Sequence, residues 1–392
     1  MDFSLCATDR AFQESVRGFA RRNLAPGAVG RAHDPRFPFD VARAMAEAGL
    51  IGLMLPQADG GGGGSLLQAV VAMQEIALAC PRSADVFQAG NFGAFRTLAE
   101  YATPAQKERF FAPLLKGEAI AAVAMTEPEA GSAVTELKTR AEPDGAGYRL
   151  NGGKIFTTNS EAAALFLVYC RFGAGTRGIG SVLVERGMEG FRLGVASRYM
   201  NGESWCALYF DNIFIPPEMV LLKEGGFRRQ IAGFNVERVG NAARSLALGE
   251  YCFRQATAHA EARQQFGRKL MEFQGLQWKF ADMRVALEAA ELLLYRAAAG
   301  AVEGLPDATA TAIAKLACNE AGWLAANESL QVMGGSGYSE ELLIEWCLRK
   351  IRGWMIAGGS LEMMKNRIAE DIFGRAFPQR PGPQSPGPQR PG

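Results

Sequence analysis

Histidine is scarce in this sequence, which has only His33 and His259 among 392 residues. So few histidines exclude a histidine-rich metal site and leave little room for a Ser–His–Asp triad, so we expect no metal centre. The seven cysteines occur singly, with no Cys-x-x-Cys pair. This scattered set predicts reduced thiols in the cytoplasm and not a disulfide framework.

An excess of charge of one sign is also missing, because 42 Lys and Arg stand against 41 Asp and Glu. Near-neutrality argues against nucleic acid as a partner. Apolar runs such as 162–170 are far shorter than the ~20 residues that a membrane span needs. Charged residues interrupt positions 1–20, so no signal peptide is visible. We therefore expect a cytoplasmic protein without a membrane span.

Two changes of hydrophobic period divide the chain. Apolar residues follow helical spacing up to residue 122, alternate as in strands from 123 to about 222, and return to helical spacing after Phe227. These patterns predict an α+β protein with a helical domain (1–122), a mainly antiparallel β domain (123–230) and a helical bundle (231–375). Within them, single helices are expected over 84–101, 233–262 and 340–373. The Pro- and Gly-rich tail, 376–392, is expected to be disordered.

Residues 124–159 contain two neighbouring patterns that favour ligand binding. Thr126–Ser132 is a polar, turn-rich loop, which offers N–H groups and hydroxyls. Tyr148–Gly152 reads as a strand ending in an Asn-Gly turn, and Lys154–Asn159 reads as the return strand of a hairpin. Phe156 and Thr158 then share a face. An aromatic plane beside a hydroxyl suits a flat heteroaromatic ligand.

The segments TEPEAGS and YRLNGGKIFTTN together resemble the two flavin-site signatures of the acyl-CoA dehydrogenases, and the resemblance covers roughly residues 10–375. It implies an N-terminal helical domain, a middle β domain and a C-terminal four-helix bundle, with FAD between the last two. By this resemblance Thr126 bonds the pyrimidine side of the flavin, Phe156 replaces the usual Trp against the ring, and Thr158 reaches N5. The implied FAD contacts are Met125, Thr126, Ser132, Phe156, Thr158, Arg263, Phe266, Gln274, Gln331, Gly334, Gly335 and Ser360.

Some of these contacts imply an oligomer. Arg263–Gly267, RQQFG, resembles a family motif whose arginine suits the FAD pyrophosphate, since its planar fork engages two phosphate oxygens. Phe266 is expected near the adenine. In the family, Gln274 and the 331–337 loop contact the FAD of a neighbouring subunit. The resemblance therefore implies a homodimer or homotetramer.

The catalytic base departs from the family pattern. Many members carry a Glu near the C-terminus, but the matching position here is Gly358. A minority place the base on the first bundle helix, and Asn235–Arg238 matches that motif with Asn in place of Asp. Glu237 is therefore the predicted base, because burial can raise a carboxyl pKa toward neutrality. The Gly358 N–H is expected to polarise the thioester carbonyl.

The substrate contacts are less regular. Ser132 and Arg238 match positions that touch the pantetheine or nucleotide part of CoA in relatives. Ala133 and Lys350 replace acidic residues that are common there, which puts acyl-carrier contacts and local ion pairs in question.

The resemblance implies an FAD-dependent acyl-thioester dehydrogenase that oxidises, or in reverse reduces, the α,β bond of an acyl group on CoA or a carrier protein. An electron-transferring flavoprotein is the expected electron acceptor. Alternatives on the same fold are a flavin monooxygenase, a base-free lyase such as a desulfinase, and a flavoprotein scaffold without chemistry. The desulfinase depends on an arginine that aligns with Asp85, which argues against that alternative.

Overall fold

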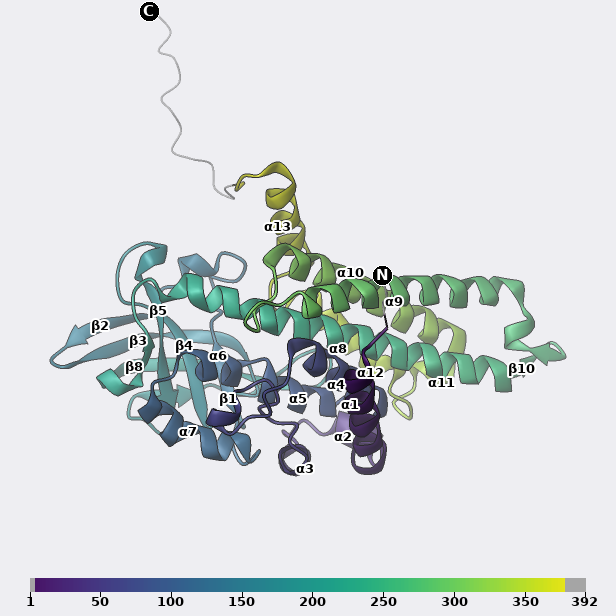
Figure 1. Ribbon diagram of the computed structural model, residues 1–392, viewed down its shortest axis with the longest axis horizontal. Coiled ribbons are helices and arrows are strands. Elements are labelled where there is room, and N and C mark those ends of the chain that lie inside the picture. Colours follow the sequence, from purple (N-terminus) through teal and green to yellow (C-terminus); the bar gives the residue numbers. More distant parts are fainter. Residues whose placement is uncertain (1–3, 378–392) are drawn as a thin grey trace, which may run out of the picture.

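Residues 4–377 are described by the computed structural model, so the predicted tail lies outside the described residues except for its first two positions. Figure 1 shows a β-rich end, a central helical region and long helices that extend away from both. The N-terminal region is built from helices only, with one π-helical turn, η1 (Ala20–Leu24). Its α-helices are α1 (Ala7–Phe19), α2 (Ala28–His33), α3 (Phe39–Glu47), α4 (Leu66–Ala79), α5 (Ser83–Asn91), α6 (Ala94–Tyr101) and α7 (Pro104–Leu115).

The single helix expected over 84–101 is wrong, because the chain breaks between α5 and α6. Gly93 has a non-helical backbone, with φ −85° and ψ −139°. Just before it, the buried Asn91 side chain accepts from Leu53 N (2.8 Å) and donates to Leu50 O (2.8 Å). These bonds tie the apolar connection after α3 to the end of α5.

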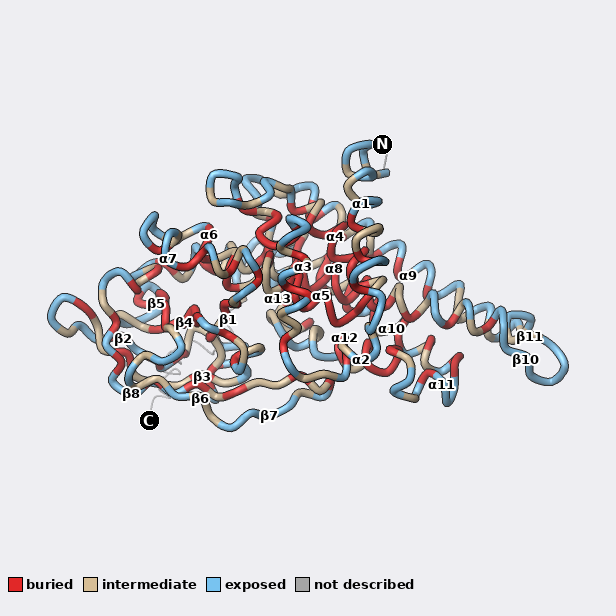
Figure 2. Tube along the Cα trace, turned by 90° about the horizontal axis from the view of Figure 1, so that it is seen from below, coloured by how far each residue is buried: buried red, intermediate tan, exposed pale blue. Residues whose placement is uncertain are grey.

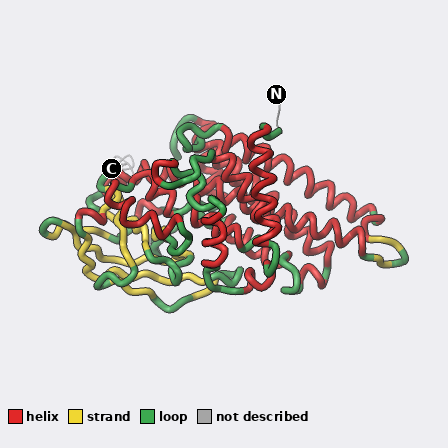
Figure 3. The backbone as a smooth tube through the Cα atoms, turned by 60° about the horizontal axis from the view of Figure 1, so that its bottom comes forward, coloured by secondary structure: helices red, strands yellow, loops and turns green. Residues whose placement is uncertain are grey.

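The middle region is one mainly antiparallel sheet in the order β6-β8-β3-β2-β4-β5-β9. β1 joins β4 in parallel, and β2 touches β4 in parallel at one position. Figure 3 shows these strands gathered at one end of the molecule. The strands are β1 (Ala121–Ala124), β2 (Arg140–Asp144), β3 (Gly147–Thr158), β4 (Leu165–Arg171), β5 (Ile179–Glu185), β6 (Phe191–Leu193), β7 (Ser197–Arg198), β8 (Ser204–Ile215) and β9 (Val220–Leu222).

The predicted Asn-Gly hairpin turn is wrong. β3 runs without a turn through Asn151-Gly152, with irregularities in its pairing with β8 on either side. The reversal lies earlier, where Asp144 of β2 pairs with Gly147 of β3 around Gly145 (φ 57°). A Cβ on Gly152 would lie 2.6 Å from Thr139 Oγ1, so glycine serves a close approach here and not a turn.

The C-terminal region is a bundle of long helices: α8 (Gly226–Ala262), α9 (Gln274–Ala299), α10 (Ala308–Met333), α12 (Ile344–Trp354) and α13 (Leu361–Phe373), with the short α11 (Gly335–Tyr338). α8 and α10 pack closely, since a Cβ on Gly249 would lie 2.7 Å from the Cα of Gly322. The continuous helix expected over 340–373 is wrong, because Gly358 and Gly359 have φ of 73° and 93°. That backbone ends the helical run before Ser360 caps α13.

Buried residues concentrate where the N-terminal helices meet α8, as the red segments of Figure 2 show around α4, α5 and α8. In the part of the chain that the structure describes, no helix combines the length and apolarity needed to cross a bilayer. The buried core is continuous from these helices into the sheet, where β4 and β5 are buried along almost their whole length.

Candidate active site

The loop that carries Met125 and Thr126 is anchored to β3 by a buried lysine. Lys154 Nζ donates to Met125 O (3.0 Å) and pairs with Glu127 Oε1 (2.7 Å). Glu127 also accepts from the backbone N–H groups of Lys138 (2.5 Å) and Thr139 (2.9 Å). Because this carboxylate is satisfied from both sides, the loop has a fixed position beside the sheet.

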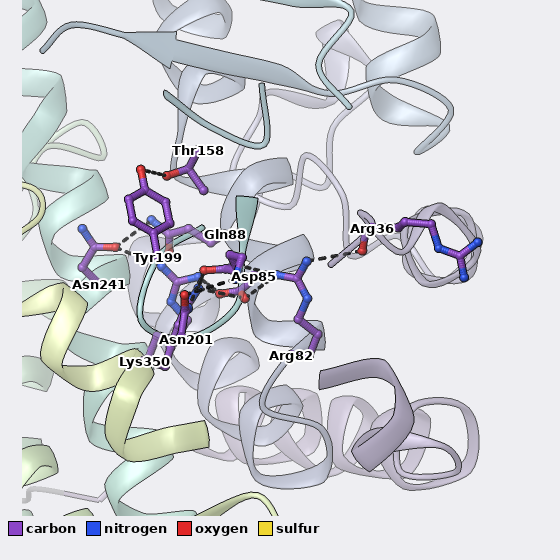
Figure 4. A network of polar contacts seen from close by, with 11 residues as sticks. Arg36, Arg82, Asp85, Gln88, Thr158, Tyr199, Asn201, Asn241 and Lys350 are labelled. Carbon is purple, nitrogen blue, oxygen red and sulfur yellow. Dashed lines mark hydrogen bonds and ion pairs between the residues drawn. The ribbon is translucent and has the colours of Figure 1, made fainter. Parts of the chain in front are cut away.

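An open aromatic face lies at the end of β3. Phe156 has φ 54° and is 51% exposed, and its ring lies 4.5 Å from that of Trp205. The Tyr199 hydroxyl donates to Phe156 O (2.9 Å) and lies 3.3 Å from Thr158 Oγ1 (Figure 4). Burial raises the pKa of Tyr199 to about 12, so its phenol stays protonated at neutral pH. Phe156 and Thr158 thus share the exposed face that their spacing predicts.

Glu237, Asn241 and Arg244 occupy one face of α8, at positions i, i+4 and i+7. Glu237 is partly buried, and within the described residues no hydrogen bond holds its carboxylate. Burial raises the pKa of Glu237 to about 7, although the positive charges of Arg244 and Arg238 oppose the shift. A carboxylate with a pKa near neutrality is suited to remove a proton at physiological pH.

The Gly358-Gly359 loop is held by two cations. Arg238 Nε donates to Gly358 O (2.9 Å), and Lys315 Nζ donates to Gly359 O (2.7 Å) and Trp354 O (3.0 Å). Burial lowers the pKa of Lys315 to about 7, with a further contribution from Arg238. Both carbonyls are bound, whereas the N–H groups of Gly358 and Gly359 have no backbone acceptor within residues 4–377.

Gly358 has no room for a side chain. A Cβ there would lie 2.9 Å from Asn241 Nδ2 and 3.7 Å from Lys315 Cε, and its φ of 73° disfavours L residues. A Glu at this position therefore requires Asn241 to move. Glycine at 358 and asparagine at 241 therefore fit each other, because the Asn241 side chain occupies the space that a side chain at 358 would need.

Five buried charges join all three regions, and Figure 4 shows Arg82, Asp85 and Lys350 among them. Arg82 and Lys350 each contact Asp85 (2.8 and 3.0 Å). Arg82 and Lys350 also pair with Glu203, and Arg244 pairs with Asp85. Although burial opposes ionisation, Lys350 and Arg82 hold the pKa of Glu203 well below its usual range. We call Arg82, Asp85, Glu203, Arg244 and Lys350 the charge network.

This network explains a departure that the sequence revealed. Lys350 replaces a residue that is acidic in many relatives, and the structure pairs it with Asp85 from α5. Lys350 therefore forms its own ion pairs, with Asp85 and Glu203, in place of those that an acidic residue would form. Asp85 also lies beside Arg82 and Arg244, so the lack of an arginine at position 85 does not make this region anionic.

The remaining predicted flavin contacts lie at the other end of α8 (Figure 1). Arg263 ends the helix, and Phe266, at φ 53°, is 95% exposed in the turn of the β10 (Gln264–Gln265) and β11 (Arg268–Lys269) hairpin. Twenty-six residues of helix from Glu237 to Arg263 span roughly 39 Å. One chain therefore does not bring Arg263 to the Glu237 end of α8. The other members of this exposed group are Gln274, Gln331, Gly334 and Gly335.

Three predicted residues have clear structural roles of their own. Ser132 is exposed in the loop before β2. Ser360 Oγ accepts from Met363 N (3.4 Å) as the N-cap of α13. Arg238 also donates to Asn235 Oδ1 (2.8 Å), so its guanidinium is engaged by its own chain.

Comparison with known proteins gives the family. Models of the acyl-CoA dehydrogenase N-terminal, middle and C-terminal domains match residues 7–118, 122–213 and 224–373. The chain belongs to the acyl-CoA dehydrogenase family. The predicted family and its architecture, helical domain, β domain and helical bundle, are confirmed.

Relatives of more than one activity match this chain over almost its whole length. It is 33% identical to the short-chain-specific acyl-CoA dehydrogenase of Clostridium acetobutylicum, covering 95% of this chain and 100% of that protein. It is 34% identical to the 3-sulfinopropanoyl-CoA desulfinase of Advenella mimigardefordensis, covering 96% of both. Among solved structures, butyryl-CoA dehydrogenase of Megasphaera elsdenii has a TM-score of 0.89 at 30% identity, covering 95% and 100%.

Several residues of this acyl-CoA dehydrogenase site were not identified from the sequence. Arg82, Glu203 and Arg244 meet only in the folded chain, because they are separated by more than a hundred residues from at least one partner. Lys315 and Asn241 lie in ordinary helical patterns. The one usable signal was the pair of unusual charges, Asp85 and Lys350.

Proposed function

We propose that this protein is an acyl-thioester dehydrogenase that uses FAD to oxidise the α,β bond of an acyl group on CoA or a carrier protein, or reduces it in reverse. Membership of the family confirms the predicted enzyme class, an FAD-dependent oxidoreductase of the acyl-CoA dehydrogenase type. The observation that carries the proposal is Glu237, a carboxylate without a partner in the described chain and with a pKa of about 7 beside the Gly358 loop.

The residues at the end of β3 fit the flavin ring. Phe156 offers an open aromatic face, and Thr158 offers a hydroxyl beside it. Tyr199 fixes both, since its hydroxyl contacts Phe156 O and Thr158 Oγ1. Met125 and Thr126 lie on the loop that Lys154 anchors to the same strand. We assign these residues, with Ser132 and Ser360, to the near part of the FAD site.

Bound FAD would accept a hydride from the β carbon of the acyl group. Glu237 takes the α proton, because it is the carboxylate whose pKa lies near neutral on the α8 face toward Gly358. The Gly358 N–H donates to the thioester carbonyl and stabilises charge on that oxygen. Arg238 positions this donor by holding Gly358 O, in addition to the substrate contact that the resemblance implies.

The proposed assembly is a homodimer or homotetramer whose neighbouring subunits complete each FAD site. Arg263, Phe266, Gln331, Gly334 and Gly335 are exposed, and Arg263 lies roughly 39 Å along α8 from Glu237. Exposed Trp278, Val285 and Leu292 repeat every seven residues on α9, which places an apolar stripe on one helix face. Contact with a second copy would bury this stripe. We further propose a cytoplasmic location and an electron-transferring flavoprotein as electron acceptor.

Anaerobic mixing with short acyl-CoA thioesters tests the proposed function. The flavin absorbance of the purified holoenzyme should bleach with at least one saturated thioester, without added reductant. A preparation that never takes up FAD, or a flavin that no thioester reduces, would contradict the dehydrogenase. Product hydroxylation with supplied reduced flavin and oxygen would instead indicate the monooxygenase.

A desulfinase-type lyase is the second candidate, since similarity to 3-sulfinopropanoyl-CoA desulfinases is as high as that to dehydrogenases. The charge network weakens the objection based on Asp85, because Arg82 lies three residues away on the same stretch of chain. This activity needs no base, so it predicts sulfite release that is unaffected by Glu237→Gln. Sulfite measured from 3-sulfinopropanoyl-CoA, with no lasting bleaching of the flavin, would favour it.

A further inference from the structure

Three buried N–H donors around Arg244 have no acceptor in the described chain. They are Asn241 Nδ2, Arg244 Nε and Trp354 Nε1. We call these three residues the donor cluster. Buried donors are satisfied in most proteins, because an unpaired donor has lost its hydrogen bonds to water without replacement. One acceptor beside them, Oε1 of the Gln88 amide that contacts Asn241, is also unpaired, so the donors outnumber the free acceptors here by three to one. This excess of donors favours an acceptor from outside this chain.

The donor cluster is a single place and not three separate defects. The Arg244 guanidinium lies 3.8 Å from the centre of the Trp354 ring. Asn241 Oδ1 accepts from Arg244 Nη2 (3.3 Å) and from Gln88 Nε2 (3.4 Å), which sets the direction of the amide. Its Nδ2 then lies 2.9 Å from the place where a Gly358 side chain would begin. Asn241 therefore lies beside the Gly358 loop, one helical turn beyond Glu237 on α8, and Arg244 lies a further turn along, against Trp354 of α12.

The charge network next to these donors carries a surplus positive charge. Three cations, Arg82, Arg244 and Lys350, face two anions, Asp85 and Glu203, which gives 3 − 2 = +1. All five side chains are at most 9% exposed. Burying an unbalanced charge is costly, and a bound anion would offset that cost. Glu237 makes no salt bridge with this network, but its carboxylate lies near enough to Arg244 for the two charges to interact, so the surplus of +1 applies when Glu237 is protonated.

An alkyl chain does not suit such surroundings. It would leave the three donors unpaired and add no negative charge, while an oxygen acceptor with a negative charge would satisfy both. The position is suitable for the far end of an acyl group, because Glu237 at i−4 serves the α carbon and Asn241 lies further along the same helix face.

We infer that the donor cluster binds an oxyanion at the far end of a short acyl group, so that the preferred thioesters are those of dicarboxylic or sulfinic acids and not of fatty acids. This inference rests on the proposed function for the position of the thioester. The carboxylate and the sulfinate share the recognised chemistry, two or more negatively charged oxygens, and the test below distinguishes them.

Calorimetry of the holoenzyme with glutaryl-CoA, 3-sulfinopropanoyl-CoA and uncharged pentanoyl-CoA measures recognition without requiring turnover. At least one charged thioester should bind about 10-fold to 100-fold more tightly than pentanoyl-CoA, as expected for charge-assisted hydrogen bonds. Whichever charged thioester binds more tightly identifies the anion. Equal or tighter binding of pentanoyl-CoA would overturn the inference, even if that thioester bleaches the flavin and so supports the dehydrogenase.

Asn241→Val removes a donor of the cluster and leaves an apolar side chain in its place. The variant should bind the charged thioester about 10-fold more weakly and pentanoyl-CoA as tightly as the parent or more tightly. The control Asn327→Val on α10 should change neither affinity. An equal loss for both thioesters would assign Asn241 a purely structural role and refute the cluster as an anion site. If Asn241→Val does not fold, the wild-type comparison decides alone. A charged preference without bleaching by any thioester would keep the inference and contradict the proposed function.

Discussion

The two ends of α8 lie in opposite environments, one enclosed by the chain and one exposed. Around Glu237, Asn241 and Arg244 the helix is enclosed by three regions of its own chain, and its charges are set by buried neighbours. Beyond Ala262 the same helix ends at an exposed arginine and a phenylalanine with nothing covering its ring. The first end fixes pKa values and holds the Gly358 loop, which is what proton transfer requires. The second end offers side chains outward, which is what a shared site requires.

Glu237→Gln gives the largest expected effect and tests the enclosed end. The amide keeps the size of the side chain but cannot take a proton, so flavin reduction by an acyl thioester should fall ~10²–10⁴-fold. In the parent, the reduction rate should rise with pH around about 7 as Glu237 ionises, and this rise should vanish in the variant. Stopped-flow absorbance measures both.

Glu261→Gln is the matched control, because this exposed residue lies on α8 near the other end. The flavin of Glu261→Gln should be reduced by the acyl thioester at the parental rate. A parental rate in Glu237→Gln itself would show that another group, or none, removes the proton, and the lyase would then become the leading function.

Arg263→Ala tests the outward end and should have a smaller effect. If this guanidinium engages the FAD of a neighbouring subunit, its loss should weaken FAD binding by about 1.5–3 kcal/mol, as for a hydrogen bond to a charged group. Equilibrium dialysis measures the affinity, and light scattering reports the assembly. Arg254→Ala, a surface residue paired with Glu250 on the same helix, should retain full affinity.

A holo-monomer in light scattering, or undiminished FAD affinity in Arg263→Ala, would remove the difference between the two ends. Arg263 and Glu237 of one chain could not then both contact the same FAD, because roughly 39 Å of helix separates them.

The smallest expected effect is on stability against pH. Folding raises the pKa of Glu237 from 4.5 to about 7, so the folded state binds the proton more tightly. By linkage, stability is lost as pH rises from 4.5 to about 7 and then stays level. Glu237→Gln should therefore be more stable than the parent by about 1–3 kcal/mol at pH 8.5 and equal to it at pH 4.5. Urea denaturation at the two pH values measures this, and a gain at pH 4.5 would contradict it.

Periodicity predicted the long helix that ends at residue 262, although α8 begins earlier, at Gly226, and it failed where one residue or one contact decides. The limits of α10 and α4 follow apolar spacing closely, since long regular segments carry that signal. The break at Phe92-Gly93 depends on a buried Asn91 that reaches back to residues 50–53, and no local pattern shows this. The Asn-Gly pair in β3 resembles a turn signal, yet its glycine serves a close approach of Thr139.

Sequence motifs predicted the site residues that lie within the motifs themselves. Phe156, Thr158 and Glu237 were identified from the sequence, and the structure gives them an open ring face, a shared surface and a raised carboxyl pKa. The charge network was not predictable, because its pairs join α5, α8, α12 and the segment before β8 across more than a hundred residues. Which charges meet depends on tertiary packing alone.

The charge network also constrains the order in which the molecule can fold. Arg82 and Asp85 can pair with each other early, since they lie three residues apart, but Glu203, Arg244 and Lys350 reach them from distant parts of the sequence. Lys350 lies on α12, near the end of the described chain. During synthesis the N-terminal helices must therefore wait for almost the whole polypeptide before this network is complete. We expect the three regions to lose structure together in a single cooperative transition, and an isolated fragment ending before α12 to remain incompletely packed, because Asp85 and Glu203 would both lose their contact with Lys350.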